Sequence, residues 1–353
     1  AGFIGSNFVH YWRKAHPEDR IVVLDALTYA GNFHNLAGLE ASSFRFVHGD
    51  IASQELVTSL LRAEKIDTLV HFAAESHVDR SITGPDVFIA TNIVGTHSLL
   101  KAAREVWLEE RAVPEHRFHH VSTDEVFGSL GPQDPPFSET TPYAPKSPYS
   151  ASKAASDHLV RAYHHTYGLR VTTSHCSNNY GPRQFPEKLI PLCIVNMLLG
   201  RPLPVYGDGR HVRDWLHVDD HCRGIDLILG QGRAGEVYNL GAGAERANID
   251  LVTSLCQHVD DAFRRSPELA RRFPAAPGAR GASAQSLIIH VSDRPGHDRR
   301  YGLDTRKARR ELGFEAGRAL AQGLEDTVGW YLANESWWDA ILTGRYRHAT
   351  LPN

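Results

Sequence analysis

Two stretches decide the fold: Ala1-Gly2-Phe3-Ile4-Gly5 and Ile21-Val22-Val23-Leu24-Asp25. The second is a short, continuous apolar run that ends in an acid, which is typical of a parallel strand buried on both faces. The first has the glycine spacing of a turn that enters a helix, where bare amide groups can approach a phosphate. A strand normally precedes such a turn, so we expect the natural chain to extend upstream by one short strand and a Gly-Gly turn.

Four further stretches have the length of strands, and helical stretches lie between them. The expected strands are 44–47, 68–72, 118–122 and 171–174, and the expected helices are 54–64, 86–110 and 150–167. Strands that alternate with helices of this length indicate βαβ units. The predicted fold class is therefore α/β, with a doubly wound parallel (Rossmann-type) sheet whose first strand is missing from this chain.

The composition of the 353 residues is that of an ordinary globular protein, with a formal net charge of -3. This balance does not favour an electrostatic nucleic-acid binder, and no apolar run approaches the length of a membrane span. The cysteines are scattered without metal or redox spacing, so we expect free thiols, a reducing cytoplasmic location and no metal site. They are Cys176, Cys193, Cys222 and Cys256.

Asp25 lies about 20 residues after the glycine turn, at the end of the next strand. A carboxylate there accepts hydrogen bonds from an adenosine ribose and repels a 2′-phosphate, which favours NAD over NADP. Alternatively, the glycines serve only close packing and Asp25 only caps its strand. Small or acidic residues also follow the next two strands, at the edge that lines the ligand crevice; they are Asp50, Ile51, Ala73 and Ala74.

Tyr149 and Lys153 share one face of the expected helix, because residues four apart are neighbours on a helix. A tyrosine titrates near about pH 10, and both an ammonium group and a bound nicotinamide cation would pull its pKa down. Tyr149 could then take a proton from a hydroxyl group as hydride leaves the same carbon, and Lys153 could hold the nicotinamide ribose. The alternative is an exposed helical pair without chemistry.

Several motifs together resemble the dTDP-glucose 4,6-dehydratases, a family of extended short-chain dehydrogenases. The matching segments are 73–82 (AAESHVDRSI), 122–128 (STDEVFG), 147–153 (SPYSASK), 176–182 (CSNNYGP), 185–191 (FPEKLIP), 213–216 (RDWL) and 293–297 (DRPGH). The resemblance implies an NAD-dependent lyase. It also implies an NAD-binding domain over residues 1–180, interleaved with roughly 211–240, and a smaller, irregular lobe over 181–353 that mainly binds a nucleotide sugar. Residues 264–286 fall outside the resemblance, and we expect them to be a surface excursion.

Asp124 and Glu125 discriminate between reactions within this group. An epimerase moves hydride at one carbon only, whereas a 4,6-dehydratase must also remove the C5 proton and release the C6 hydroxyl as water. Adjacent carboxyl groups can supply both an acid and a base if one is protonated and the other ionised. The resemblance implies that Glu125 is the base at C5, that Asp124 is the acid at C6, and that Thr123 bonds the 4-hydroxyl and Tyr149. As an isolated pair, Asp124 and Glu125 would only cap a turn.

The resemblance also implies two wider sets of binding residues. The cofactor set is Gly2, Phe3, Ile4, Gly5, Asp25, Leu27, Thr28, Asp50, Ile51, Ala73, Ala74, Ser76, Thr91, Tyr149, Lys153 and Asn179. The substrate set is Ser76, Thr123, Asn178, Lys188, Leu189, Pro204, Tyr206, Arg213, Asn248, Asp293, Arg294 and His297. Arg213 and Arg294 suit a diphosphate, since guanidinium binds phosphate in a bidentate manner, but either could join the lobes instead.

The expected partners are the nucleotide sugar dTDP-glucose and a second copy of the chain, paired through helices 86–110 and 150–167. Neither a nucleic acid nor a membrane is expected as a partner. Three alternatives stay open at this point. They are a 4,6-dehydratase of a CDP-, UDP- or GDP-hexose, an epimerase of such a sugar, and a non-catalytic NAD-binding sensor. The sensor would predict a damaged tyrosine, lysine or acidic pair, and all of these residues are present.

Overall fold

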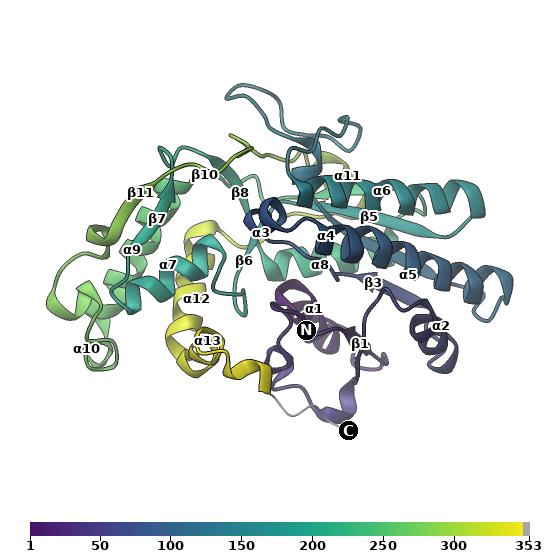
Figure 1. The fold of residues 1–353 in the computed structure, drawn as a ribbon, viewed down its shortest axis with the longest axis horizontal. Helices are drawn as coiled ribbons and strands as arrows, with labels where there is room; N and C mark the ends of the chain where they lie inside the picture. Colours follow the sequence, from purple (N-terminus) through teal and green to yellow (C-terminus); the bar gives the residue numbers. More distant parts are fainter. Residues whose placement is uncertain (349–353) are drawn as a thin grey trace.

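The computed structural model describes residues 1–348 and has two lobes, one built on parallel strands and one mainly helical (Figure 1). The first lobe contains a four-stranded parallel sheet in the order β3-β4-β5-β9 and a separate parallel pair, β1-β2. The strands are β1 (Val22–Asp25), β2 (Arg45–His48), β3 (Thr68–His71), β4 (Arg117–Thr123), β5 (Val171–Cys176) and β9 (Val237–Leu240). The predicted parallel strands are confirmed, and the strand expected upstream stays a prediction.

Helices cover both faces of this sheet, because its strands are apolar on both sides. Phe118 and Val121 lie on opposite faces of β4, since side chains alternate along a strand. Phe118 packs against one layer of helices and Val121 against the other. The first layer is α2 (Gln54–Ala63), α5 (Thr96–Ala103) and α6 (Pro148–Tyr167); the second is α1 (Phe3–Ala15), α8 (Val218–Gln231) and α11 (Arg306–Leu312). The doubly wound arrangement is therefore confirmed.

The helix expected over 86–110 is present as one continuous run with two π-helical parts. Its parts are α4 (Asp86–Phe88), η3 (Ile89–Gly95), α5 and η4 (Arg104–Glu109), and the short α3 (Val78–Thr83) precedes it. In the π-helical η3, Asn92 is buried and bonds both to the backbone of Glu75 and to Ser152 of α6. The wider π turn thus ties this helix to α6 and to the segment after β3.

The second lobe has its own apolar core, in which α7, α9 and α12 pack together. Its elements are β6 (Asn178–Tyr180), α7 (Leu189–Leu198), β7 (Leu203–Tyr206), β8 (Val212–His217), β10 (Glu245–Ala247), α9 (Asn248–Arg265), α10 (Glu268–Arg272), β11 (Ile288–Val291), α12 (Leu320–Ala333) and α13 (Glu335–Leu342). Short 3₁₀ helices complete the described chain: η1 (Phe33–Leu36), η2 (Ala41–Ser43), η5 (Asp124–Phe127), η6 (Pro277–Arg280), η7 (Ala284–Leu287) and η8 (Arg345–His348). Strand β9 and helices α8 and α11 return to the first lobe, but the division into domains stays a prediction.

The expectation that residues 264–286 form a surface excursion is wrong. Leu269, Phe273, Ala276 and Ala284 are buried and belong to the core of the second lobe. Three arginines of the segment, Arg264, Arg265 and Arg272, face outward and form ion pairs with α9, α12 and α13, such as Arg265 with Glu325 at 2.8 Å. The apolar residues are few and irregularly spaced, so the composition of the segment does not reveal that they are buried.

Residues 1–348 contain no helix that is both long and apolar enough to cross a membrane. The four cysteines are all buried and none forms a disulfide, which confirms the expectation of free thiols.

Candidate active site

The acidic pair follows β4 directly, in the 3₁₀ helix η5. Thr123 caps this helix, because its hydroxyl accepts a hydrogen bond from the backbone N–H of Glu125 at 3.3 Å. Gly128 ends it with a φ of +86°, and a Cβ at this position would lie 2.6 Å from the carbonyl oxygen of Ala144. Only glycine fits this turn, so the local sequence holds Asp124 and Glu125 at the carboxyl end of the strand.

Tyr149 and Lys153 lie in the first two turns of α6. Ser147 and Ser150 form a reciprocal capping box and Pro148 occupies the first turn, which fixes where the helix begins. Tyr149 is 8% exposed and Lys153 is 4% exposed, so the alternative of an exposed helical pair is wrong. Both side chains face the end of β4, where the acidic pair lies.

The two carboxyl groups of the acidic pair have different surroundings. Asp124 is 2% exposed, and one of its carboxyl oxygens has no hydrogen-bond partner. Burial and the neighbouring Glu125 raise the pKa of Asp124 well above its ordinary value. Burial also raises the pKa of Glu125, but the cations of Arg294, Lys188 and Arg213 oppose that shift. These surroundings therefore favour the protonated form more strongly at Asp124 than at Glu125.

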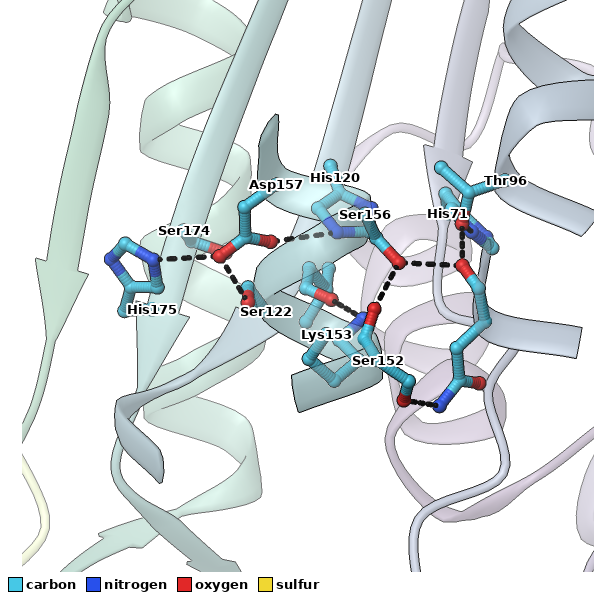
Figure 2. Close-up of polar contacts among 12 residues, drawn as sticks. His71, Thr96, His120, Ser122, Ser152, Lys153, Ser156, Asp157, Ser174 and His175 are labelled. Atoms are coloured by element: carbon cyan, nitrogen blue, oxygen red, sulfur yellow. Dashed lines mark hydrogen bonds and ion pairs between the residues drawn. The ribbon is translucent and has the colours of Figure 1, made fainter. Parts of the chain in front are cut away.

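The pKa of Tyr149 differs from the expectation. Burial raises the pKa of its phenol well above the ordinary value, the Glu125 carboxylate raises it further, and the Thr123 hydroxyl opposes both. The ammonium group of Lys153 donates a 2.8 Å hydrogen bond to the carbonyl oxygen of Val121, so it is held against the backbone of β4 (Figure 2). Lys153 by itself therefore does not bring the pKa of Tyr149 down, and the lowering expected from Lys153 together with a bound nicotinamide cation stays a prediction.

The segments predicted to hold NAD fit a dinucleotide at the start of α1. A Cβ at Gly2 would meet no atom within 4 Å, whereas one at Gly5 would touch Phe72 after β3 at 3.6 Å. Gly2 therefore leaves room for a close ligand, and Gly5 permits close packing of helix and strand. Asp25 accepts a hydrogen bond from the backbone N–H of Leu27 at 2.7 Å.

A cavity of about 380 Å³ opens beside Asp25. Its lining includes Leu27 and Thr28, two residues predicted to bind NAD, and Tyr346 and Arg347 from the far end of the described chain. The hydroxyl of Tyr346 donates a hydrogen bond to the carbonyl oxygen of Tyr29, which fixes this wall of the cavity. The C-terminal residues of this lining were missed by the sequence analysis, and nothing in the local pattern of 345–348 signals them.

Most of the other predicted cofactor residues follow the carboxyl ends of β2 and β3. Asp50 and Ile51 follow β2, Ala73, Ala74 and Ser76 follow β3, and Thr91 lies in η3. Asn179 lies on β6. Its amide nitrogen donates to the carbonyl oxygen of Ser177, and its amide oxygen is hydrogen-bonded to Nδ1 of His221 on α8, at 2.9 Å each. A nicotinamide contact by Asn179 stays a prediction and would compete with these bonds.

Several predicted substrate residues meet where the second lobe contacts α3. Asp293 lies 3.2 Å from His211 and 2.6 Å from His297, and Asn248 donates its backbone N–H to the carbonyl oxygen of His211 at 2.9 Å. Tyr206 packs its ring edge against His297, with the ring centroids 6.0 Å apart. Pro204 lies on β7 with Tyr206, and Asn178 lies on β6.

The remaining predicted substrate residues lie between this group and the acidic pair. Lys188 precedes Leu189 at the start of α7 and donates to the carbonyl oxygen of Ser76 at 2.8 Å. Arg213 donates to the carbonyl oxygen of Asp298 at 2.8 Å and lies 4.2 Å over the ring of Tyr301. Arg294 forms an ion pair with Asp79 at 3.3 Å. This contact joins the lobes, which is the alternative role that the sequence left open for this arginine.

Two further residues of this group, Asp79 and His211, were not predicted from the sequence. Asp79 contacts both Arg294 and Tyr206, and it lies within the quoted motif 73–82, which was the available signal. His211, Asp293 and His297 also have donor atoms within 4.8 Å of one another, as a metal site would require. However, the two imidazoles stack in parallel with centroids 3.6 Å apart, so their in-plane lone pairs do not converge on a point. The absence of a metal site stays a prediction.

Comparison with known proteins gives a consistent result. The family model described as GDP-mannose 4,6 dehydratase matches residues 1–327. A dTDP-glucose 4,6-dehydratase of Xanthomonas campestris pv. campestris is 54% identical, and the match covers 98% of this chain and 95% of that protein.

Two solved dTDP-glucose 4,6-dehydratases have the same fold. One, from Streptomyces venezuelae with NAD and TYD bound, is 48% identical over 97% of both chains with a TM-score of 0.83. The other, from Bacillus anthracis in complex with NAD, is 42% identical over 97% of both chains with a TM-score of 0.82. The resemblance seen in the motifs is therefore confirmed over nearly the whole length: the chain belongs to the dTDP-glucose 4,6-dehydratase family.

Proposed function

We propose that this chain converts dTDP-glucose to dTDP-4-keto-6-deoxyglucose and water as an NAD-dependent 4,6-dehydratase. C4 of the hexose is oxidised, water is lost across C5 and C6, and then hydride is added at C6 and a proton at C5. NAD, when bound, supplies the hydride acceptor for C4 and the hydride donor for C6. The reaction is redox-neutral and consumes no external reductant. The proposal is supported by the names and the NAD complexes of the relatives.

The contrast between Asp124 and Glu125 carries this proposal within the site itself. Asp124 is buried and has a strongly raised pKa, so it can give a proton to the departing C6 hydroxyl. Glu125 faces three cations and can accept the C5 proton, which becomes acidic once C4 is a ketone. Two carboxyl groups whose environments separate their pKa values are the arrangement that acid and base chemistry at one site requires.

The other residues hold the reacting groups in place. Tyr149 receives the proton of the 4-hydroxyl, and Thr123, whose hydroxyl lies near Tyr149, accepts or donates at the same oxygen. Lys188, Arg213 and Arg294 place positive charge beside Glu125, and the same cations suit a diphosphate. Gly2 to Gly5 and Asp25 would hold NAD, with the pyrophosphate at the first turn of α1.

We also propose that the protein is a cytoplasmic homodimer paired through α4, η3, α5 and α6. Val87, Ile89 and Val94 are 46–50% exposed along one continuous helix of the expected interface. Large apolar side chains grouped on a helix favour burial against a second copy. The variant Val94→Lys is expected to elute as a monomer in size-exclusion chromatography with light scattering. An unchanged mass for this variant, or a monomeric native protein, would contradict the proposed interface.

The reaction is tested by incubating the protein and NAD separately with dTDP-, CDP-, UDP- and GDP-linked hexoses and analysing the products by mass spectrometry. The expected result is loss of 18 Da from dTDP-glucose without net NADH. Loss of water only from another nucleotide hexose would move the proposal to that substrate. An unchanged mass with inversion at C4 would identify an epimerase, and no product from any sugar would favour the sensor.

A further inference from the structure

Behind the reacting residues, one face of α6 carries three buried polar side chains in successive turns. Tyr149, Lys153 and Asp157 are spaced four residues apart and therefore share a face. All three are less than 10% exposed. Tyr149 and Lys153 have roles in the proposed reaction, but Asp157 lies one turn deeper, away from the acidic pair. Its burial without an assigned role needs a physical explanation, because ionised carboxylates are costly to bury.

Asp157 is surrounded by groups that can donate hydrogen bonds (Figure 2). One carboxylate oxygen accepts from the hydroxyl of Ser122 at 2.8 Å, from that of Tyr143 at 3.0 Å and from Nε2 of His175 at 3.1 Å. The other oxygen lies 3.0 Å from Nε2 of His120. A carboxylate can only accept, so four facing donors select its ionised form.

The imidazole of His120 does not neutralise this carboxylate by becoming charged itself. Burial, and next the charge of Lys153, lower the pKa of His120 to about 4, so the ring is neutral and acts through its N–H. For Asp157, burial acts to raise the pKa, but the hydrogen bonds from His120 and His175 outweigh it and hold the pKa below the ordinary value. Asp157 is thus a full negative charge in the interior.

Lys153 is the cation that this charge can act upon. Within residues 1–348, no lysine or arginine forms a direct ion pair with Asp157; its ion-pair partners are His120 and His175. Consecutive residues of β4 hold the two groups, since Lys153 donates to the carbonyl oxygen of Val121 and Asp157 accepts from Ser122. Burial lowers the pKa of Lys153, and Asp157 is the largest influence that raises it.

We propose that Asp157 is a positioning residue of the dehydratase: its buried carboxylate, fixed by Ser122, Tyr143, His120 and His175, is the counter-ion that keeps Lys153 an ammonium group behind Tyr149. This inference rests on the proposed function for the roles of Tyr149 and Lys153. Without Asp157, an ammonium group at this depth would lose its proton more readily, and only a bound nicotinamide cation would then support the phenolate that must form at Tyr149.

Other titratable groups also face this pair and belong in any account of its pH dependence. They are His71 on β3, His120 on β4, His175 and Cys176 on β5, Tyr143 in the loop before α6, and Tyr149 on α6 itself. Burial lowers the pKa of His71 and raises that of Cys176 to about 12, so both are uncharged near neutrality. Asp157 is therefore the negative charge on which Lys153 depends.

The test follows Lys153 directly, using NMR of the NAD-bound enzyme grown on lysine labelled with ¹³C at Cε. The chain has only seven lysines, so Lys153→Met assigns the resonance. In the native protein, Lys153 is expected to be protonated at pH 8. In Asp157→Asn, which keeps the shape and removes the charge, its titration should move down by at least about one pH unit. Asp157→Glu, which keeps the charge, should restore it.

Asp220→Asn is the matched control, because Asp220 is also buried and instead holds backbone N–H groups of Gly317 and Arg318. This variant should lose stability without moving the titration of Lys153. For dTDP-glucose turnover, Asp157→Asn should move the basic limb of the kcat profile to lower pH by the same amount and leave KM nearly unchanged. A purely structural role would instead reduce kcat evenly at all pH values.

Two results would overturn the inference. One is a Lys153 resonance that titrates alike in the native protein and in Asp157→Asn. The other is a native Lys153 that is already neutral at pH 8, a measurement that needs no variant to fold. The NMR titration does not depend on turnover. A protein that fails to dehydrate any nucleotide hexose would overturn the proposed function, but its NMR titration would still show whether Asp157 keeps Lys153 protonated.

Discussion

Asp124 and Asp157 lie near the same end of β4, and burial affects them in opposite ways. Asp124 follows the strand and has one carboxyl oxygen without a partner, and its pKa is raised well above the ordinary value. Asp157 bonds to Ser122 near the end of that strand, faces four donors, and has a lowered pKa. The number of donors around each carboxyl group, rather than its depth, decides whether it carries a proton. Asp124 accepts only one long hydrogen bond, from Thr123 at 3.4 Å, whereas one oxygen of Asp157 accepts three and the other lies 3.0 Å from Nε2 of His120.

The largest expected effect comes from replacing Glu125, the neighbour of Asp124 in the acidic pair. Glu125→Gln should reduce formation of the keto-deoxy product about 10³-fold, in line with removal of a general base. The first hydride step does not need this base, so transient NADH should still appear at 340 nm in a stopped-flow experiment. Normal turnover by Glu125→Gln would show that another group removes the C5 proton.

The next effect is the loss of stability in Asp157→Asn. Because the folded pKa of Asp157 is lowered, its contribution is fully present above the unfolded value of about 4 and is lost as the pH falls through the folded value. Asparagine cannot accept from all four donors, so we expect the free energy of unfolding at pH 7 to fall by about 3 kcal/mol. Urea denaturation at pH 7 and at pH 4 measures this loss, which should be smaller at pH 4. Equal stability at pH 7 would contradict the four-donor account.

The smallest effect has the opposite sign and belongs to Asp124→Asn. The folded pKa of Asp124 is raised, so its favourable contribution exists below about pH 4 and is lost as the pH rises through the folded value. Replacing it with a neutral side chain should therefore raise the free energy of unfolding by about 1 kcal/mol at pH 8 and change little at pH 4. A variant less stable than the native protein at pH 8 would show that Asp124 is ionised in the fold. Thermal denaturation at the two pH values distinguishes these outcomes.

The strands and helices of the first lobe could be predicted because their signals are local. Strand β1 lies in a continuous apolar run of the sequence, and α6 begins at a proline and a serine cap. Residues with a known motif, such as Glu125 and Tyr149, were also placed correctly near one another. These features need no knowledge of distant segments.

Features that depend on packing between distant segments could not be predicted. Phe273 is buried only because α9 and α12 come together around it, and the sequence of its own segment does not signal burial. The raised pKa of Tyr149 follows from burial and from Glu125, neither of which its spacing to Lys153 reveals. Asp157 was overlooked, although its place four residues after Lys153 on an otherwise buried face was a usable signal.

The most direct test of the account is to follow one hydrogen through the reaction. The protein and NAD are incubated with dTDP-glucose carrying deuterium at C4, and the product is analysed by mass spectrometry and proton NMR. The account predicts that the deuterium appears at C6 of the 4-keto-6-deoxy product, with no added reductant and with a solvent proton at C5. Deuterium retained at C4, or lost to solvent, would contradict the proposed dehydration.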